Sequence, residues 1–370
     1  MKLMELHLHQ FRNYIDTRVR FQKGINILYG PNGAGKTNIL EAIYYLAITK
    51  SFRTSVDKHL IYSTADMFRI QGLLRTHQGE EIVAHVAYSP TRGKHLNVNG
   101  RKITRFADYI GDIPIVLLCP SDLTISQGGP QQRRRFLDIL LSQASKVYLH
   151  HLVQYRRALK QRNLLLQHSD VEKPLLESWE DNLIKHGTML IQKRMAMVEE
   201  LNRQVQEWYR LMSRTSDKVK MIYRSNLSLS PADRLEENYR RAFEKQRSVE
   251  KEQAVTMVGP HRDDLLFLIN GKPMKTYASQ GEHKTFVVAL KLAEYHYLRR
   301  QKSEAPILLF DDIFGELDAG RIAQMLDHLG GMGQVFVTTT SRDFFGKLSR
   351  DAHNARYYYV NKGTIEPVEA

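Results

Sequence analysis

Residues 30–37, GPNGAGKT, constrain the fold of this chain more than any other feature of its sequence. They match the pattern Gly-x-x-x-x-Gly-Lys-Thr and stand between two apolar segments, 24–29 and 38–48. Glycines let the backbone turn so tightly that its N–H groups point inward at phosphate oxygens, and the start of a following helix adds partial positive charge. The sequence therefore predicts a buried strand, a phosphate-binding loop and a helix in direct succession.

The residue types in this loop predict separate roles. We expect Lys36 to reach the β- and γ-phosphates of a bound nucleotide, and Thr37 to ligate Mg²⁺. The alternative is a glycine-rich turn that holds no nucleotide, and the strand before it and the helix after it argue against that. The predicted nucleotide-binding residues of the loop are Gly30, Pro31, Asn32, Gly33, Ala34, Gly35, Lys36 and Thr37.

A phosphate loop of this kind needs a second metal ligand, and residues 307–312, ILLFDD, supply one. The four apolar residues predict a buried strand, and Asp311 follows at its carboxyl end, where ligands bind in open α/β sheets. We expect Asp311 to hold Mg²⁺ and Asp312 to polarise the attacking water. Either residue could instead cap a helix.

About 275 residues separate Lys36 from Asp311, so a large insertion must leave the sheet and return to it. Helical patterns with little turn chemistry dominate the middle of the chain. We therefore expect an α/β domain built from 1–120 and 255–370, and a largely helical insertion, 121–254. Within the insertion, an apolar stripe from Ile191 to Met212 predicts a helix packed inside the chain, with an intermolecular coiled coil as the alternative.

The charge balance favours a polyanionic partner. The chain has 54 Lys and Arg against 40 Asp and Glu, a formal net charge of +14, which is typical of nucleic-acid binding. Residues 131–163 contain eight basic side chains and one acidic one, half of that excess. A solvated helix face is the alternative. The predicted DNA contacts are Arg156, Arg157, Lys160 and Arg162.

Other classes of protein are excluded by what the sequence lacks. Cys119 is the only cysteine, which excludes an internal disulfide scaffold and a cysteine-based zinc site. No apolar run approaches the roughly 18 residues that span a bilayer. We expect a soluble, cytoplasmic protein with no membrane partner.

Residues 278–283, ASQGEH, open a predicted helix before Asp311. They resemble the signature motif of ABC-type ATPases, in which a serine hydroxyl and a glycine amide bind the γ-phosphate of the nucleotide on the other subunit. The resemblance assigns that role to Ser279 and Gly281, whereas ordinary helix N-capping is the alternative. It also implies a head-to-tail homodimer with ATP at the interface.

Two further stretches follow the same pattern. Residues 316–318, ELD, resemble the D-loop that comes after the metal strand in ABC-type ATPases. Residues 338–340, TTT, stand where transporters of that class have a switch histidine. The absence of that histidine implies slow hydrolysis.

Residues 8–14, LHQFRNY, resemble the opening of SMC-like ATPases and imply that Arg12 and Asn13 approach the nucleotide; a surface β-turn is the alternative. Three more stretches extend the likeness, and together with the phosphate loop and 311–318 they resemble the RecF family of bacterial recombination mediators. The three stretches are 129–138, GPQQRRRFLD, 155–165, YRRALKQRNLL, and 259–264, GPHRDD.

This resemblance implies a fold, an activity and partners. The fold would be an α/β, ABC-type P-loop ATPase head, a mixed sheet plus an antiparallel β subdomain, with a helical second lobe. The protein would bind ATP and Mg²⁺, dimerise, bind double-stranded and gapped DNA, hydrolyse ATP slowly, and help to load recombinase with the RecR and RecO mediators. The alternatives are a nucleotide-switched DNA-binding scaffold with negligible turnover and a transporter subunit; the basic insertion argues against the transporter subunit.

Overall fold

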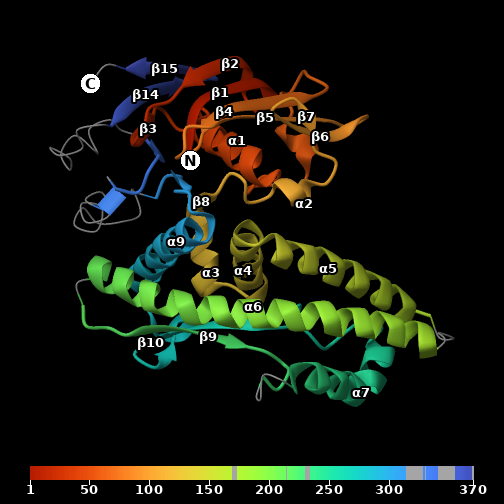
Figure 1. The fold of residues 1–370 in the computed structure, drawn as a ribbon. Helices are drawn as coiled ribbons and strands as arrows, with labels where there is room; N and C mark the ends of the chain where they lie inside the picture. The colour runs from red at the N-terminus through yellow and green to blue at the C-terminus, as the bar shows by residue number, and fades with distance from the viewer. Residues whose placement is uncertain are drawn as a thin grey trace. The chain divides into compact units, whose positions relative to one another are not determined.

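In the computed structural model the chain forms two compact units (Figure 1). Unit 1 comprises Met1–Leu123, Trp208–Thr215 and Gln280–Ala370, and unit 2 comprises Thr124–Glu207 and Ser216–Ser279. The residues that the structure describes are 1–168, 173–213, 215–229, 234–313, 328–329, 331–340 and 355–368. Across these ranges, no helix combines the length and apolar character needed to cross a bilayer.

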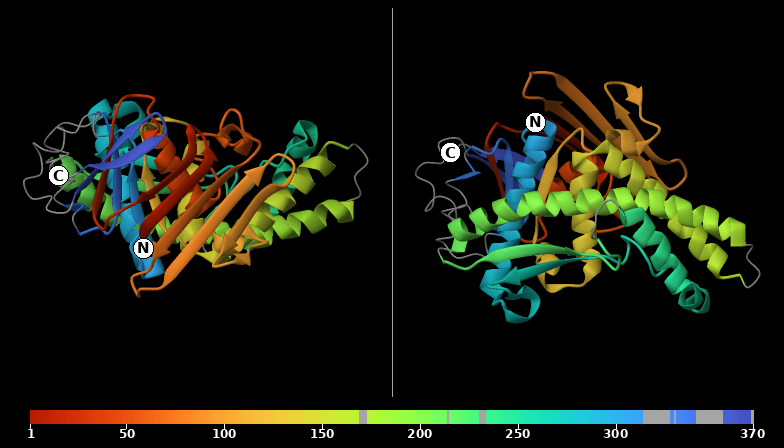
Figure 2. Two further views of the ribbon diagram at one scale, coloured as in Figure 1. Left: turned by 90° about the horizontal axis from the view of Figure 1, so that it is seen from above. Right: turned by 60° about the horizontal axis from the view of Figure 1, so that its bottom comes forward.

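An antiparallel sheet of six strands forms the N-terminal part of unit 1 (Figure 2, left). Its strands alternate buried and exposed residues; in β4, for example, Phe68 and Ile70 are buried while Arg69 and Arg75 are exposed. This period of two places one face of the sheet on the core and the other in solvent. In spatial order the strands are β2 (Tyr14–Arg20), β1 (Lys2–Phe11), β4 (Phe68–Arg75), β5 (Glu81–Ser89), β6 (Gly93–Val98) and β7 (Arg101–Lys102).

The second sheet of unit 1 is mixed, and its central strands are parallel and buried along most of their length, which is typical of parallel sheets. β3, β13 and β12 are neighbours, so their carboxyl ends meet at one edge of the sheet. Among the described strands of this sheet, only β14 and β15 pair antiparallel. In spatial order the strands are β15 (Thr364–Val368), β14 (Arg356–Asn361), β3 (Ile25–Tyr29), β13 (Val335–Thr339), β12 (Ile307–Phe310) and β8 (Ile115–Leu118).

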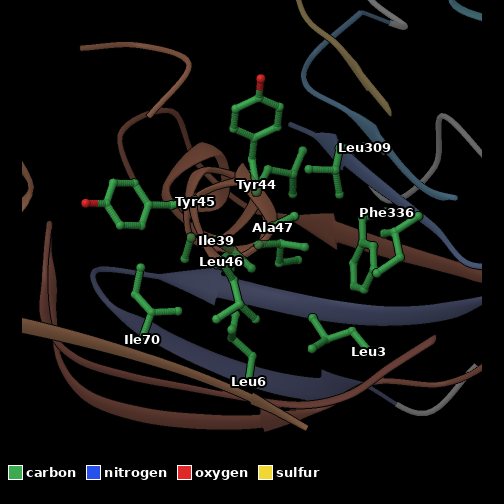
Figure 3. Packing of buried hydrophobic residues seen from close by; sticks show 14 of the residues in the cluster. Leu3, Leu6, Ile39, Tyr44, Tyr45, Leu46, Ala47, Ile70, Leu309 and Phe336 are labelled. Atoms are coloured by element: carbon green, nitrogen blue, oxygen red, sulfur yellow. The ribbon is translucent and has the colours of Figure 1, made fainter. Parts of the chain in front are cut away.

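Helix α1 (Lys36–Ile48) shares one hydrophobic core with both sheets (Figure 3). Eleven of its thirteen residues are buried, so the helix has almost no solvent face, and its sequence is accordingly apolar on nearly every side. Burial of each large apolar side chain contributes roughly 1.5–3 kcal/mol. The cluster includes Leu3, Leu6 and Ile70 from the antiparallel sheet, Ile39, Tyr45 and Leu46 from α1, and Leu309 and Phe336 from the mixed sheet.

The other helices of unit 1 are shorter, except for α9, which is buried along most of its length. Those whose bounds lie within the described residues are the 3₁₀ helices η1 (Asp57–Leu60) and η2 (Pro120–Asp122) and the α-helices α2 (Phe106–Tyr109) and α9 (Gln280–Lys302). Helix α3 (Leu123–Gln127) begins at the last residue of the first segment of unit 1.

Unit 2 is largely helical, as the sequence predicts, and it also contains a three-stranded antiparallel sheet. Its helices are α4 (Pro130–Ala144), α5 (Lys146–Leu166), α6 (Lys173–Ser213, whose last turns belong to unit 1), α7 (Leu235–Gln253) and α8 (Met274–Tyr277). The strands are β11 (Lys272–Pro273), β10 (Asp264–Ile269) and β9 (Val219–Arg224).

The stripe that begins at Ile191 packs inside the chain, because Ile191, Val198 and Val205 are all buried within one copy. Its polar member, Asn202, accepts a hydrogen bond from the backbone N–H of Met221 on β9 and donates one to the carbonyl oxygen of the same residue. The intramolecular interpretation is therefore confirmed, and the polar residue is explained by its contact with a strand.

The return of the chain to unit 1 differs from the sequence-based boundary. We expected it at residue 255, whereas Val255 to Ser279 belong to unit 2. The physical reason is strand pairing: β10 pairs with β9 from Asp264↔Arg224 to Ile269↔Val219. The sequence pairs Asn99-Gly100 and Asn270-Gly271 each predict a two-residue hairpin turn. Both predictions are confirmed, because the first pair joins β6 to β7, the second joins β10 to β11, and all four residues have positive φ.

Candidate functional site

The phosphate loop requires glycine at three positions. Gly30, Gly33 and Gly35 have φ angles of 153°, 78° and 113°, all in the region that other residues rarely adopt. A Cβ at Gly30 would also clash with the carbonyl oxygen of Val360, and a Cβ at Gly35 would clash with the side chain of Asn13. At Gly33 nothing lies within 4 Å of the Cβ position, so there the backbone conformation alone requires glycine.

The turn after β1 supports this loop. The Asn13 side-chain amide donates to the carbonyl oxygen of Ala34 at 3.0 Å, and the Asn38 amide donates to Asn13 Oδ1 at 2.8 Å. The Tyr14 hydroxyl donates to the carbonyl oxygen of Gly35 at 3.0 Å. Two hydrogen bonds thus fix the turn against the loop and a third joins it to α1, so it is more than a surface turn.

Arg12 in the same turn pairs with a buried carboxylate. Its Nε and Nη2 donate to the two carboxylate oxygens of Glu41 at 2.8 and 2.7 Å, and its Nη1 donates to the carbonyl oxygen of His59 at 2.9 Å. Glu41 lies on α1 and is fully buried, so it needs a charged partner. Direct contact of Arg12 and Asn13 with a nucleotide stays a prediction.

Asp311 meets the phosphate loop across the edge of the sheet. The Thr37 hydroxyl donates to Asp311 Oδ1 at 2.8 Å, and the Thr338 hydroxyl at the end of β13 donates to the same oxygen at 2.9 Å. Burial raises the pKa of Asp311 above its ordinary value, and the two hydroxyl bonds oppose that rise. The two segments that the sequence predicts to meet are therefore brought together.

Lys36 lies near both aspartates. Its ammonium group donates to the carbonyl oxygens of Gly30 at 2.7 Å and Pro31 at 2.8 Å. Burial lowers the pKa of Lys36, while the charges of Asp312 and Asp311 raise it. Asp312 is exposed and has a φ of 50°, and its backbone N–H donates to the Thr338 hydroxyl at 2.9 Å. The loop lysine and both predicted carboxylates therefore share one electrostatic environment.

The Thr37–Asp311 pair fits a magnesium ion. A threonine hydroxyl and a carboxylate are hard oxygen donors of the kind Mg²⁺ prefers, and such sites use few protein ligands because water and phosphate complete the shell. Asp311 is only 6% exposed, and in the described part of the chain it forms no ion pair that would compete for the metal.

Helix α9 begins at Gln280, so Ser279 immediately precedes the helix and Gly281 lies in its first turn. Ser279 is exposed. The predicted helix start is confirmed, and the γ-phosphate role of Ser279 and Gly281 stays a prediction. The D-loop resemblance at 316–318 lies outside the described residues.

Sequence reasoning missed Arg53 and did not predict the role of Thr338. Arg53 Nη1 donates to Asn38 Oδ1 at 2.8 Å, next to Thr37, and its positive charge lowers the pKa of Asp311. No motif spacing marks Arg53. Thr338 could have been found from strand order, because a residue ending β13 must lie beside one ending β12.

Three of the four predicted DNA contacts are exposed on α5. Arg157 and Lys160 point into solvent, and the side chain of Arg156 is 59% exposed although its Nη2 donates to Asp138 Oδ2 at 2.8 Å. Arg156 and Lys160 line a shallow open hollow on this helix together with Asn163 and Leu164. Contact of Arg156, Arg157 and Lys160 with DNA stays a prediction.

The prediction for Arg162 is wrong, because this side chain is fully buried. Its Nη2 donates to Glu180 at 2.8 Å and to Glu250 at 2.5 Å. Helical periodicity explains the burial, since Tyr155, Ala158, Arg162 and Leu166 form the inward stripe of α5. Arg162 is therefore an internal counter-ion and has no surface for phosphate.

A phosphate loop between β3 and α1, a magnesium-type carboxylate after β12 and a signature-type serine before α9 define an ABC-type ATPase head. The family model described as the RecF/RecN/SMC N terminal domain matches residues 2–366. DNA replication and repair protein RecF of Chloroherpeton thalassium is 38% identical, with 95% of this chain and 98% of that protein covered. The RecF protein of Halalkalibacterium halodurans is also 38% identical, with 99% of each chain covered. The chain therefore belongs to the RecF family.

Solved structures agree with this assignment. The recombination mediator protein RecF in its RecF-ATP form, described as part of the RecFOR pathway, superposes with a TM-score of 0.91 at 30% identity, covering 99% of this chain and 97% of that chain. The RecF-ATPrS form gives the same TM-score and identity. An Smc head bound to the C-winged helix domain of ScpA gives a TM-score of 0.58 at 17% identity, which shows the shared ATPase-head fold alone.

Proposed function

We propose that this chain is an ATP-dependent DNA-binding protein of recombinational DNA repair and replication. The observation that carries the proposal is the 2.8 Å contact between Thr37 and Asp311, which joins the phosphate loop to a carboxylate about 275 residues away. Membership in the RecF family supports the link to DNA repair, because relatives such as the Chloroherpeton protein are named for DNA replication and repair.

The proposed site works mainly by position and charge. Lys36 holds the terminal phosphates, and Thr37 and Asp311 hold Mg²⁺, which when bound neutralises phosphate charge. Asp312 is exposed beside Lys36 and polarises the attacking water. Beside Asp311, Thr338 presents a hydroxyl and not an imidazole, so it provides no second base. This is in keeping with slow, DNA-dependent hydrolysis.

In the proposed active form, two copies bind two ATP molecules between them. Ser279 and Gly281 of one copy contact the γ-phosphate held by the other, so ATP joins the copies in a homodimer. The exposed position of Ser279 at the start of α9 supports this role. A symmetric pair would contain two identical sites.

In the same proposal, α5 contacts double-stranded DNA, including duplex next to a single-stranded gap. Arg156, Arg157 and Lys160 contact the phosphate backbone, which carries no sequence information. The protein helps to load recombinase together with the RecR and RecO mediators in the cytoplasm; solved RecF relatives are described within the RecFOR pathway.

Sedimentation and DNA binding test this proposal together. Wild type and Lys36→Met are each measured with Mg-ATP and with Mg-ADP, with labelled duplex and gapped DNA. We expect dimer and tight DNA binding only for wild type with ATP, and a steep fall in affinity with salt. An unchanged mass with and without Mg-ATP contradicts the dimer, and a flat salt dependence contradicts a phosphate interface.

Hydrolysis needs its own measurement. Single-turnover hydrolysis with and without DNA gives the rate, and Asp312→Asn is expected to prolong the ATP-bound dimer because the water is no longer polarised. A dimer lifetime unchanged by Asp312→Asn contradicts the role assigned to this residue.

A further inference from the structure

The β6–β7 end of the antiparallel sheet is strongly basic. No Asp or Glu occurs between Glu81 and Asp108, whereas five Lys or Arg residues do. One of them, Lys94, already has a counter-ion within unit 1, because its ammonium group lies 2.9 Å from the carboxylate of Asp57. The other four are exposed: Arg92, Arg101, Lys102 and Arg105.

Three of these cations have no counter-ion of their own. Within the described residues, Arg92, Arg101 and Lys102 form no ion pair, whereas Arg105 lies 3.9 Å from Asp108. Acidic residues elsewhere on this sheet are paired: for example, Glu81 bonds Arg75 at 2.6 Å. The uncompensated charge of the sheet is therefore concentrated at its β6–β7 end.

Strand register adds a row of hydrogen-bond donors beside this charge on the solvent face. Lys102 pairs with Asn97, Asn97 with His85, and His85 with Gln71, so these four side chains form one row over β7, β6, β5 and β4. At the usual spacing of about 4.8 Å between strands, the row is roughly 14 Å long. It contains no carboxylate, and every member can donate a hydrogen bond in at least one protonation state.

The neighbouring row on the same face has the same character. It runs from His95 through Ala87 to Arg69. Burial and the positive charge of Arg69 lower the pKa of His85, whose Nε2 is buried with no hydrogen-bond partner in the described residues. We define the basic sheet face as Arg69, Gln71, His85, His95, Asn97 and Lys102, with Arg92 and Arg101 at its edge.

Protection of a sheet edge explains only part of this surface. Charged side chains on a short edge strand such as β7 prevent pairing with other sheets. Arg101 and Lys102 serve that purpose, and acidic side chains there would serve it equally well. Edge protection does not require the adjoining rows on β4, β5 and β6 to lack carboxylates. Two neighbouring rows that present donors and cations and no carboxylate are complementary to a polyanion.

We propose that the basic sheet face is a second phosphate-contact surface for duplex DNA, separate from α5. The inference rests on the proposed function, because it assumes that the chain binds DNA. Arg92 and Arg101 stand at opposite ends of β6, which at about 3.4 Å per residue places them on the order of 20 Å apart along the strand. That separation corresponds to roughly six base-pair steps of one DNA strand.

Charge reversal at the edge tests the surface. In Arg101→Glu/Lys102→Glu the edge strand stays charged, so edge protection is kept while attraction for phosphate becomes repulsion. The control, Lys23→Glu/Lys362→Glu, makes the same change in net charge at exposed turns of unit 1. Binding of a labelled 30-base-pair duplex is measured by fluorescence anisotropy in Mg-ATP over a range of salt concentrations, after ATP binding and thermal unfolding confirm that each variant is folded.

We expect the edge variant to bind duplex at least about tenfold more weakly than the control. The slope of log Kd against log salt should fall by about two, because two cations no longer meet a phosphate. An edge variant with the affinity and slope of the control overturns this inference and leaves the proposed function standing. Failure of the wild-type protein to bind duplex overturns the proposed function and, with it, this inference.

Discussion

At the scale of single residues, one carboxylate oxygen organises the candidate site. Asp311 Oδ1 accepts hydrogen bonds from Thr37 and Thr338, and the backbone N–H of Asp312 bonds the Thr338 hydroxyl in turn. Thr338 thereby positions the Asp311 carboxylate and the backbone of Asp312 without belonging to the phosphate loop. Because burial raises the pKa of Asp311, each hydroxyl bond helps to keep this carboxylate ionised.

Thr338→Val tests this orienting role. The substitution removes a hydrogen bond to a buried carboxylate with little change in volume, and such bonds contribute about 1.5–3 kcal/mol. We expect Mg²⁺-dependent ATP binding to weaken at least about tenfold, measured by titration of a fluorescent ATP analogue. The matched control is Thr17→Val, which also removes a hydroxyl bond in unit 1, to the carbonyl oxygen of Gly363 at 3.0 Å. Equal ATP affinities of the two variants contradict the role.

A second residue-scale prediction concerns Arg162. Arg162→Met leaves Glu180 and Glu250 buried without their shared partner, and breaking a buried pair in this way costs about 3–5 kcal/mol. We expect the urea midpoint of unfolding to fall accordingly. Arg157→Met is the control on the exposed face of α5, with an expected change within about 0.5 kcal/mol. Equal midpoints for the two variants contradict the buried network.

At the scale of elements, the sequence is informative where the signal is local. The phosphate loop, the strand and helix around it and the two Asn-Gly hairpins are determined by a few adjacent residues, and all were predicted. The partners of Arg162 could not be predicted, because Glu180 and Glu250 come from α6 and α7. The pairing of β9 with β10 could not be predicted either, because α7 separates the two strands in the sequence. This pairing moves the unit boundary to Ser279.

Two histidines of unit 2, the buried His186 and the partly buried His261, make its stability depend on pH. Burial lowers the pKa of His186 and of His261 to about 4, from an ordinary value near 6.5. Between these values the unfolded chain binds protons that the folded chain does not, so stability is full above about pH 6.5 and falls as the pH drops towards 4.

We expect His186→Gln to reduce this loss, because glutamine keeps a hydrogen-bonding side chain beside His151 without a group that protonates. Thermal unfolding at pH 7.5, 6 and 5 measures the effect, and each kcal/mol corresponds to roughly 2–4 °C in a unit of this size. His150→Gln, at an exposed neighbouring position, is the control. An acid-dependent fall in Tm that is identical in the wild type and His186→Gln contradicts the assignment.

At the scale of the whole molecule, the proposed activity requires two copies that complete each other's nucleotide sites. Each chain contains one phosphate loop, 30–37, and one signature-type serine, Ser279. If the two motifs act on different nucleotides, Lys36→Met and Ser279→Arg should each prevent dimer formation when present in both copies. A mixed pair would retain one intact site, formed by the loop of the Ser279→Arg chain and the serine of the Lys36→Met chain.

Sedimentation of an equimolar mixture of these two variants in Mg-ATP is the most direct test. From the proposed sharing of sites, we expect each variant alone to stay monomeric and a dimer fraction to appear only on mixing and only with ATP. A mixture that stays monomeric while the wild type dimerises, or single variants that dimerise as well as the wild type, would contradict it.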